Sequence, residues 1–228
     1  MGRSRLPTLA VSLRFMRSKN INPKQKSFFN ERAGVWDEIC VHDQKKVEYI
    51  VRRIGICGDE WILDVGTGTG VMIPHYAKHL TGGNVVAVDY SEKMIEVARS
   101  KYLEKDFPMI SFIVSDLYDL KYEKAFDLVV CYSCFPHFVD QPLAIEILCK
   151  ALKEGGRLVI AHSDSARKIN GVHISGGVEI SNDFLPSIGA LKSMMTENGL
   201  TVTFERDDDD YYICIATKNV VLRKGSEK

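Results

Sequence analysis

Short apolar runs and amphipathic stretches alternate along the chain, and this alternation predicts strands and helices in turn. Each apolar run has the length of a buried parallel strand and ends at a glycine, a serine, an acidic residue or a histidine. The five runs are WILDVG (61–66), NVVAVD (84–89), SFIVSD (111–116), FDLVVCYS (126–133) and RLVIAH (157–162).

The stretches between these runs carry apolar residues at three- and four-residue steps, which is typical of amphipathic helices. Ser91 and Asp140 stand where an N-cap is expected, and Pro74 is acceptable in the first turn of a helix. Gly55 and Gly58 end an N-terminal helical stretch, and the glycines at 155–156 mark the end of a later one. Helices are predicted over residues 24–54, 71–80, 91–104, 140–152 and 183–198.

Strands that alternate with helices predict βαβ units, a parallel sheet and right-handed crossovers. LTVTFE (200–205) and YYICIATK (211–218) add a closing pair of strands around Asp207–Asp210, which we expect to be a solvated turn. Residues 163–177 are expected to be a long polar loop, and such loops are often functional. The pattern therefore predicts one α/β domain with a helical N-terminal extension, preceded by a basic tail over residues 1–23.

The net charge of the chain argues against two classes of binding protein. The 228 residues include 30 basic and 30 acidic side chains, and a neutral chain is poorly suited to broad capture of nucleic acid or of an anionic membrane. The sequence has no run of 18 apolar residues, so no membrane span is predicted. Residues 1–30 hold seven basic residues and no acidic one, a composition that fits either a tail or an organellar transit peptide.

The six cysteines lie mostly between apolar neighbours, as in ICVH, ILCK and YICIA. A domain of this size has no need of disulfides for its stability, and no secretory signal is evident. We therefore expect reduced, buried cysteines in a cytoplasmic protein.

The first strand runs into a glycine-rich turn, DVGTGTG, over residues 64–70. Glycine lets the backbone turn tightly and approach a ligand, and the following helix offers free N–H groups to an anionic end of that ligand. The spacing G-x-G-x-G departs from the dinucleotide fingerprint G-x-G-x-x-G. Asp89 ends the next strand, where a carboxylate can accept both hydroxyls of a ribose. Asp116 ends the third strand and could accept from an adenine amino group.

Five segments in order resemble the successive motifs of class I S-adenosylmethionine-dependent methyltransferases, over roughly residues 60–165. They are ILDVGTGTG, VVAVDYSEKMIEVAR, IVSDLYDL, FDLVVCYSCFPHF and LKEGGRLVIAH. Residues 24–55 and 183–218 are similar to the lid helices and the antiparallel C-terminal hairpin of that family.

The resemblance implies a Rossmann-like, doubly wound sheet of seven strands, mostly parallel with an antiparallel C-terminal strand. It implies a single methyltransferase domain over residues 24–228, with a helical lid (24–55) and a Rossmann-like core (56–228). The implied cofactor is S-adenosyl-L-methionine, and the implied partner is a small-molecule methyl acceptor.

The same resemblance assigns parts of the cofactor to residues. Its methionine end would lie at Asp64 and the turn, its ribose at Asp89, and its adenine against Tyr90 and Met94. The full set implied for cofactor binding is Asp64, Gly66, Thr67, Gly68, Gly70, Asp89, Tyr90, Met94, Asp116, Leu117 and Cys131.

Methyl transfer is an in-line displacement, so a shaped pocket and a base for the acceptor proton can suffice. His137 and His162 follow the fourth and fifth strands and are the predicted catalytic residues. The predicted substrate pocket consists of Phe29, Trp36, Phe135, His137, His162 and His173. Each histidine could equally be structural, and the aromatic residues of the lid could equally pack on the sheet. The acceptor atom, whether O, N, S or C, stays open.

Two other classes of function compete. Cys131, Cys134 and His137 fall at three-residue steps, which fits a thiol-redox or metal-binding protein, with His162 as a fourth zinc ligand. However, the next helix is expected to start near Asp140, so neither cysteine lies close to a helix N-terminus that would lower its pKa. A cofactor-binding protein without catalysis is the third hypothesis.

Overall fold

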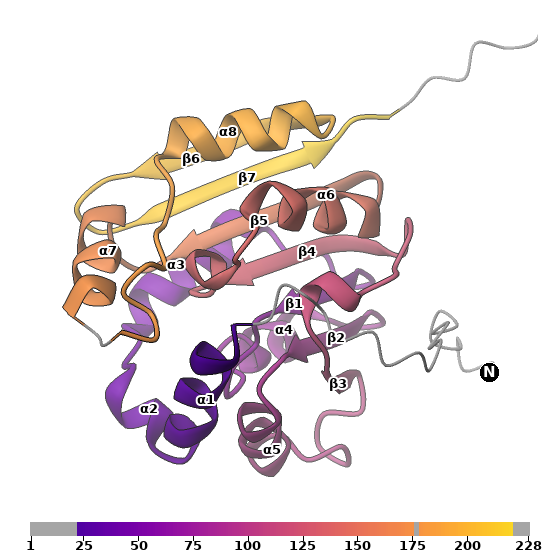
Figure 1. Ribbon diagram of the computed structural model, residues 1–228. Helices are drawn as coiled ribbons and strands as arrows, with labels where there is room; N and C mark the ends of the chain where they lie inside the picture. The colour runs from indigo at the N-terminus through magenta and orange to yellow at the C-terminus, as the bar shows by residue number, and fades with distance from the viewer. Residues whose placement is uncertain (1–21, 176–177, 221–228) are drawn as a thin grey trace, which may run out of the picture.

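The computed structural model describes residues 22–175 and 178–220 (Figure 1). Of the basic tail expected over residues 1–23, residues 1–21 lie outside this range. The first described helix, α1, begins at Pro23, because the Asn22 side chain accepts from the backbone N–H groups of Lys24 and Gln25.

The centre of the molecule is one seven-stranded sheet with the order β3-β2-β1-β4-β5-β7-β6. The strands β1 to β5 pair in parallel, and β7 pairs antiparallel with both β5 and β6. The predicted α/β sheet with an antiparallel C-terminal strand is thus confirmed. In chain order the strands are β1 (Trp61–Val65), β2 (Asn84–Asp89), β3 (Ile110–Val114), β4 (Phe126–Tyr132), β5 (Leu152–His162), β6 (Leu200–Asp207) and β7 (Tyr212–Lys218).

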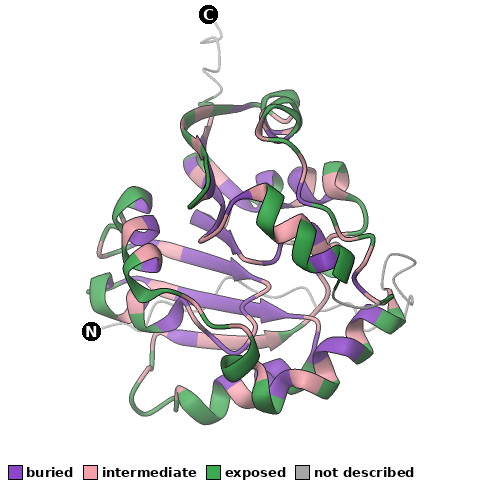
Figure 2. Ribbon diagram, turned by 90° about the vertical axis from the view of Figure 1, so that its left-hand side faces the viewer, coloured by how far each residue is buried: buried purple, intermediate pink, exposed green. Residues whose placement is uncertain are grey.

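Helices cover both faces of the sheet, and the exposed residues lie mostly on their outward sides (Figure 2). The principal helices are α1 (Pro23–Arg32), α2 (Trp36–Ile39), α3 (Gln44–Ile54), α4 (Ile73–His79), α5 (Glu92–Lys101), α6 (Gln141–Ala151), α7 (Ala166–Ser175) and α8 (Ile188–Glu197). Short 3-10 helices span Ala33–Val35, Leu117–Asp119 and Phe135–His137.

The alternation of side chains along each strand divides the core into two clusters. In β4, Val129 and Cys131 face α6 and α8, whereas Leu128, Val130 and Tyr132 face α3 and α4. Both faces are apolar because helices bury both, which explains the continuous apolar runs of the sequence. A third, smaller cluster joins α1 to α5 through Phe28, Phe29, Ala33, Met94 and Ile180.

The expected continuous helical stretch over residues 24–54 was wrong in one place. The chain leaves the helical conformation between Cys40 and Asp43, because the Asp43 carboxylate caps α3 by accepting from the N–H groups of Lys45 and Lys46. Gly55 ends α3 in the left-handed conformation, as its position predicted.

The segment 163–177 is not a loop as expected, because residues 166–175 form α7. Ser165 starts it by accepting from the N–H of Lys168, and His173 is its buried side chain. The polar composition and Gly171 concealed this helix.

Several helix boundaries also differ from expectation; α4 begins at Ile73 rather than at 71, and α5 ends at Lys101 rather than at 104. Helix α6 ends at Ala151, before the glycines at 155–156, because Leu152 already pairs with Phe126 and opens β5. Helix α8 begins at Ile188 rather than 183, because Pro186 disfavours a helical residue before it and Ser187 caps the helix.

His162 is the last residue of β5, and its ring is almost completely buried. Neither ring nitrogen has a hydrogen-bond partner among the described residues. Burial lowers the pKa of His162 to about 3. The unfolded chain binds a proton here below about pH 6.5, whereas the folded protein does so only near pH 3, so stability falls as the pH drops through this window.

We therefore expect His162→Leu to weaken the loss of stability on acidification. Between about pH 7.5 and about pH 5.5, the free energy of unfolding should fall by about 1.4 kcal/mol less in the variant than in the wild type. Urea unfolding at the two pH values measures this difference. Tyr212→Phe is the control, since it removes a neighbouring buried hydroxyl that also lacks a partner among the described residues and should act equally at both pH values. An equal acid loss in His162→Leu and wild type contradicts the prediction.

Candidate functional site

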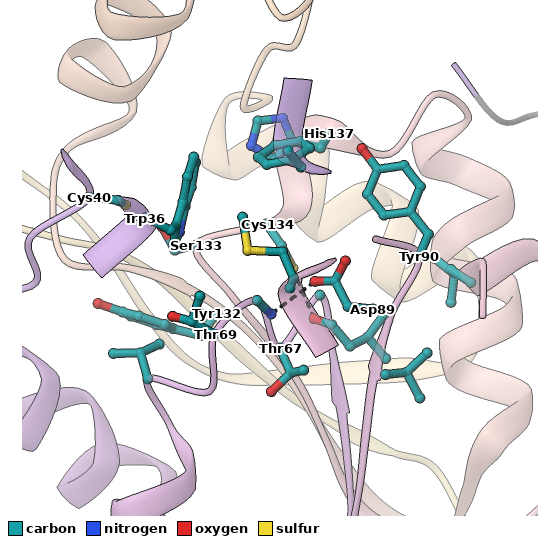
Figure 3. Close-up of a pocket in the computed structure, with 18 of the residues that line it drawn as sticks. Trp36, Cys40, Thr67, Thr69, Asp89, Tyr90, Tyr132, Ser133, Cys134 and His137 are labelled. Atoms are coloured by element: carbon teal, nitrogen blue, oxygen red, sulfur yellow. Dashed lines mark hydrogen bonds between the residues drawn. The ribbon is translucent and has the colours of Figure 1, made fainter. Parts of the chain in front are cut away.

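A pocket of about 360 Å³ lies at the carboxyl ends of β1, β2 and β4, under helices α1 and α2 (Figure 3). The sheet order reverses at β1, and ligands of open α/β sheets bind at such a switch point. In the view of Figure 3, Trp36 and Tyr132 lie on one side of the space, Asp89 and Tyr90 on the other, and His137 at the top.

The structure places most of the predicted site residues around this pocket. Those that line it are Phe29, Trp36, Gly66, Thr67, Gly68, Asp89, Tyr90, Met94, Asp116, Leu117 and His137. The predicted residues outside the lining are Asp64, Gly70, Cys131, Phe135, His162 and His173.

The glycine turn forms the floor of the pocket. The N–H groups of Gly66 and Thr67 both donate to the Val88 carbonyl, which ties the turn to the end of β2. Gly66 has φ +69°, and a Cβ atom on it would lie 2.5 Å from the Cβ of Cys134. Only glycine fits here, since both the conformation and the space exclude a side chain.

Asp64 shapes this turn from below. Its carboxylate accepts from the Thr67 hydroxyl at 2.7 Å and from the Tyr76 hydroxyl at 3.1 Å. Burial raises the pKa of Asp64 to about 6. Asp64 does not line the pocket but Thr67 does, so Asp64 acts on the pocket through Thr67.

Asp89 presents a carboxylate to the pocket. Its two oxygens accept from the N–H groups of Ser91 and Gly68, each at 2.9 Å. A carboxylate offers about four acceptor positions, so each oxygen keeps capacity for a ligand donor. Burial raises the pKa of Asp89 to about 6, although these two hydrogen bonds favour the charged form.

Tyr90, Met94, Asp116 and Leu117 line the pocket next to Asp89. One oxygen of Asp116 accepts from the N–H of Tyr118 at 3.0 Å, and burial raises the pKa of this carboxyl group. This side therefore combines apolar surface with one carboxylate, a combination suited to a flat heterocycle that bears an amino group.

Helices α1 and α2 supply an aromatic wall. Phe29 and Trp36 meet edge to face with ring centroids 5.4 Å apart, and both line the pocket. Asp37 fixes α2 to the core, because it accepts from Thr69 at 2.5 Å and from the Lys101 ammonium at 2.6 Å. These contacts position the wall over the glycine turn.

Two histidines line the pocket, and they differ in whether both ring nitrogens have a neighbour within hydrogen-bond distance. His42 Nδ1 is 2.9 Å from the Tyr132 hydroxyl, and its Nε2 is 3.6 Å from Cys40 Sγ. Burial lowers the pKa of His42. His137 Nδ1 is 2.7 Å from Asp183 Oδ2, whereas its Nε2 has no hydrogen-bond partner among the residues that the structure describes. His137 is therefore the lining histidine with a ring nitrogen available to a ligand.

The two remaining predicted histidines lie behind this lining. His162 ends β5 in the core, as described above. The ring of His173 lies 4.9 Å from that of His137, and its Nδ1 is 2.6 Å from the Asp183 carbonyl. His173 thus contacts the residues that hold His137, and its pKa is lowered, mainly by burial.

After β4 the chain turns sharply at Ser133, which has φ +56°. This conformation is uncommon for a residue other than glycine. It directs residues 133–139 along the rim, so that Tyr132, Ser133 and Cys134 line the pocket where Cys131 was expected to do so. Phe135 is fully buried.

The structure lends no support to a metal or redox centre at Cys131, Cys134 and His137. The Cys134 thiol donates to the Val65 carbonyl at 3.0 Å. Its neighbour Cys131 and burial together raise the pKa of Cys134 well above its ordinary value, so it is no reactive thiolate. Within residues 22–175 and 178–220, no group of three or more His, Cys, Asp or Glu side chains is arranged to hold a metal ion.

Sequence reasoning missed Gln25, His42 and Asp183, all of which belong to the pocket or its support. His42 was hidden because residues 40–43 were assigned to a helix. Its signal was the following Asp43, a strong N-cap residue. Gln25 and Asp183 carry no local signal, since they act through contacts between distant parts of the chain.

Comparison with known proteins identifies relatives of this chain. A family model described as a methyltransferase domain matches residues 58–208. A ubiquinone biosynthesis O-methyltransferase of Hydrogenovibrio crunogenus is 30% identical over 146 residues, which are 60% of this chain and 59% of that protein. A malonyl-[acyl-carrier protein] O-methyltransferase of Priestia megaterium is 33% identical over 139 residues, 60% of this chain and 50% of that protein. The chain thus spans between half and about three fifths of the length of these relatives.

Solved structures share the fold. Magnesium protoporphyrin IX methyltransferase from Synechocystis PCC 6803, crystallised with bound SAH, superposes with a TM-score of 0.65 at 19% identity, covering 86% of this chain and all of that one. A phosphoethanolamine N-methyltransferase of Haemonchus contortus gives a TM-score of 0.69 at 16% identity, covering 87% and 59%. With the family model matching well over half of its residues, the chain belongs to the methyltransferase-domain family of class I S-adenosylmethionine-dependent enzymes.

Proposed function

We propose that this protein transfers the methyl group of S-adenosylmethionine to a small-molecule acceptor that loses a proton, and that His137 Nε2 accepts this proton. The observation that carries the proposal is the arrangement of one pocket. It holds the Asp89 carboxylate, with acceptor capacity to spare, and the free ring nitrogen of His137.

The residues present fit the cofactor. The pocket volume of about 360 Å³ lies within the range of small-molecule sites. At Gly68, which has φ +56°, an added Cβ atom would meet nothing within 4 Å, so the backbone borders open space. Close approach of a ligand to the backbone is the use of glycine that such a turn requires.

In this proposal Asp89 accepts from the ribose hydroxyls, and Asp116 and Leu117 contact the adenine edge. Tyr90 and Met94 lie against the adenine ring. The turn Gly66–Gly70 borders the methionine end of the cofactor, with Asp64 holding the turn through Thr67. We assign the place predicted for Cys131 to Ser133 and Cys134, which line the pocket at that point.

The bound cofactor supplies a methyl group activated by its sulfonium. The protein aligns the acceptor, and alignment alone can contribute roughly 7–11 kcal/mol to lowering the barrier. His137 Nε2 would accept the proton that the acceptor loses on methylation. The aromatic wall of Phe29 and Trp36 excludes water from this region.

The small size of the acceptor is supported by the lining. Among the described residues that line the pocket, Lys101 is the one Lys or Arg, and its pairing with Asp37 leaves no basic surface there for a phosphate backbone. The two curated relatives described above are O-methyltransferases by name, which favours an oxygen acceptor.

All six cysteines are free thiols, which supports a reducing compartment such as the cytoplasm. In the part of the chain that the structure describes, no helix is long and apolar enough to cross a membrane.

Calorimetric titration and methyl transfer test the proposal together. We expect micromolar binding of both S-adenosylmethionine and S-adenosylhomocysteine to the full chain. Tritiated methyl groups should then pass to at least one compound in a panel of phenols, carboxylic acids, amines and thiols. If the folded protein binds neither S-adenosylmethionine nor S-adenosylhomocysteine, the proposal is wrong. Binding without transfer to any acceptor class favours a cofactor-binding protein without catalysis.

Asp89→Asn should weaken the binding of S-adenosylhomocysteine about 10- to 100-fold, because hydrogen bonds to a charged acceptor contribute about 1.5–3 kcal/mol each. In the wild type the dissociation constant should rise as the pH falls below about 6, since the protonated Asp89 accepts more weakly. Calorimetry at several pH values measures both effects. The variant should lose this pH dependence, and a wild-type affinity that stays constant through pH 6 contradicts the assignment.

Gly68→Ala should weaken S-adenosylhomocysteine binding at least about tenfold, or about 1.4 kcal/mol, because the added methyl group enters the pocket. Gly199→Ala is a matched control. Gly199 also has a positive φ (+75°) and open space around a Cβ atom, so both variants carry a backbone cost of about 1–2 kcal/mol. The control should lose stability to a similar extent and keep its affinity. Equal affinity in the two variants argues against ligand approach at Gly68.

A further inference from the structure

We propose that Asp183 is a positioning residue for His137: it fixes the tautomer that carries the proton on Nδ1 and so keeps Nε2 free as the proton acceptor. Gln25 of helix α1 holds the Asp183 carboxylate in place. This inference rests on the proposed function, because it explains how that function obtains its base.

The contact between His137 and Asp183 is short and sheltered. Nδ1 of His137 lies 2.7 Å from Oδ2 of Asp183, and the two side chains are 16% and 13% exposed. An ionised carboxylate can only accept a hydrogen bond, so Nδ1 must carry the proton in this contact. In a neutral imidazole Nε2 is then the unprotonated nitrogen. Asp183 does not line the pocket, so it acts through His137.

Gln25 connects the carboxylate to two further parts of the site. The residue is 2% exposed, and its Nε2 donates to Asp183 Oδ2 at 2.7 Å and to the His137 carbonyl at 3.2 Å. Its Oε1 accepts from the Tyr90 hydroxyl at 2.9 Å. The amide can satisfy the carboxylate and the hydroxyl in one orientation only, which fixes its direction. One side chain of α1 thus joins the proposed adenine side to the proposed base.

Asp183 is also held through its main chain. Its carbonyl lies 2.6 Å from Nδ1 of His173, which donates to it, and its N–H donates to the Ile180 carbonyl at 3.0 Å. The edge-to-face contact of Phe29 with the His137 ring, at 4.9 Å between centroids, restricts rotation of the ring. These contacts come from α1, α7 and the segment after it. They leave the His137 ring little freedom to turn or to exchange its tautomer.

The test reads the tautomer of His137 by nitrogen-15 NMR of the six histidine side chains, in the full chain with and without S-adenosylhomocysteine. Each ring is assigned by its loss in a single His→Gln variant. Samples are titrated upward until the ring signals no longer move with pH. We expect His137 to show protonated Nδ1 and bare Nε2. A wild-type His137 with its proton on Nε2 overturns the proposal without any further variant.

Asp183→Ala should shift His137 toward a mixture of both tautomers. His173 should keep its Nδ1 proton in the same spectra, because it donates to the main chain of residue 183, and so it serves as an internal control. Asp183→Asn retains an oxygen that can accept, so it should largely restore the wild-type tautomer. Asp164→Ala, which removes an exposed acid paired with Lys168, should change nothing. A tautomer that is unchanged in Asp183→Ala overturns the proposal.

Failure of this inference and failure of the proposed function are distinguishable. S-adenosylhomocysteine affinity depends on Asp89 and the glycine turn, so Asp183→Ala should keep it within about twofold of the wild type. Absence of binding in the wild type removes the proposed function whatever the tautomer is. Normal binding with the wrong tautomer removes the role of Asp183 alone. A more than tenfold loss of affinity in Asp183→Ala shows that the residue supports the pocket rather than the ring, and also overturns the proposal.

Discussion

The contact between the glycine turn and the end of β4 is the constraint on which the rest of the site depends. A side chain on Gly66 would overlap Cys134, so the backbone of the turn and the segment after β4 can approach each other only because residue 66 is glycine. The same turn donates two N–H groups to the end of β2. Three strand ends are thereby drawn together, and the pocket is the space that remains above them.

Two buried carboxylates on neighbouring strands illustrate how this space acquires its chemistry. Asp64 and Asp89 are both deeply buried, and burial raises the pKa of each to about 6. Asp64 accepts from Thr67 and Tyr76 and does not line the pocket, whereas Asp89 accepts from backbone N–H groups and does line it. Two aspartates near the ends of neighbouring strands therefore differ in their surroundings, because one is enclosed by the fold and the other lines the pocket.

The parts of the site that were predictable from sequence are those fixed by local pattern. Strand-terminal acids such as Asp89 and Asp116 follow from strand periodicity and from the rule that carboxyl ends of parallel strands meet at one edge. The contacts of Asp183 were not predictable, because it lies 46 positions from His137 and 158 positions from Gln25, and the three residues meet only in the folded protein. Helix α7 was missed for a different reason, since Gly171 and the polar residues around it indicated a loop although Ala166 and Ile169 pack against the core.

The run CYSCFPHF at residues 131–138 also shows the difference between what a local pattern predicts and what the folded chain decides. Its three-residue spacing suggested a ligand cluster, yet backbone geometry decides its use. Cys134 packs on the glycine turn, the left-handed Ser133 redirects the chain, and His137 reaches the pocket from the short helix that follows.

Helix α1 packs in a small cluster of its own, separate from the two clusters that bury the faces of the sheet. Sequence change can therefore accumulate in α1 and around residue 183 while both large clusters keep the sheet intact. The integrity of the sheet and the shape of the pocket therefore depend on different parts of the molecule, and the ten-residue helix α1 belongs to the second part.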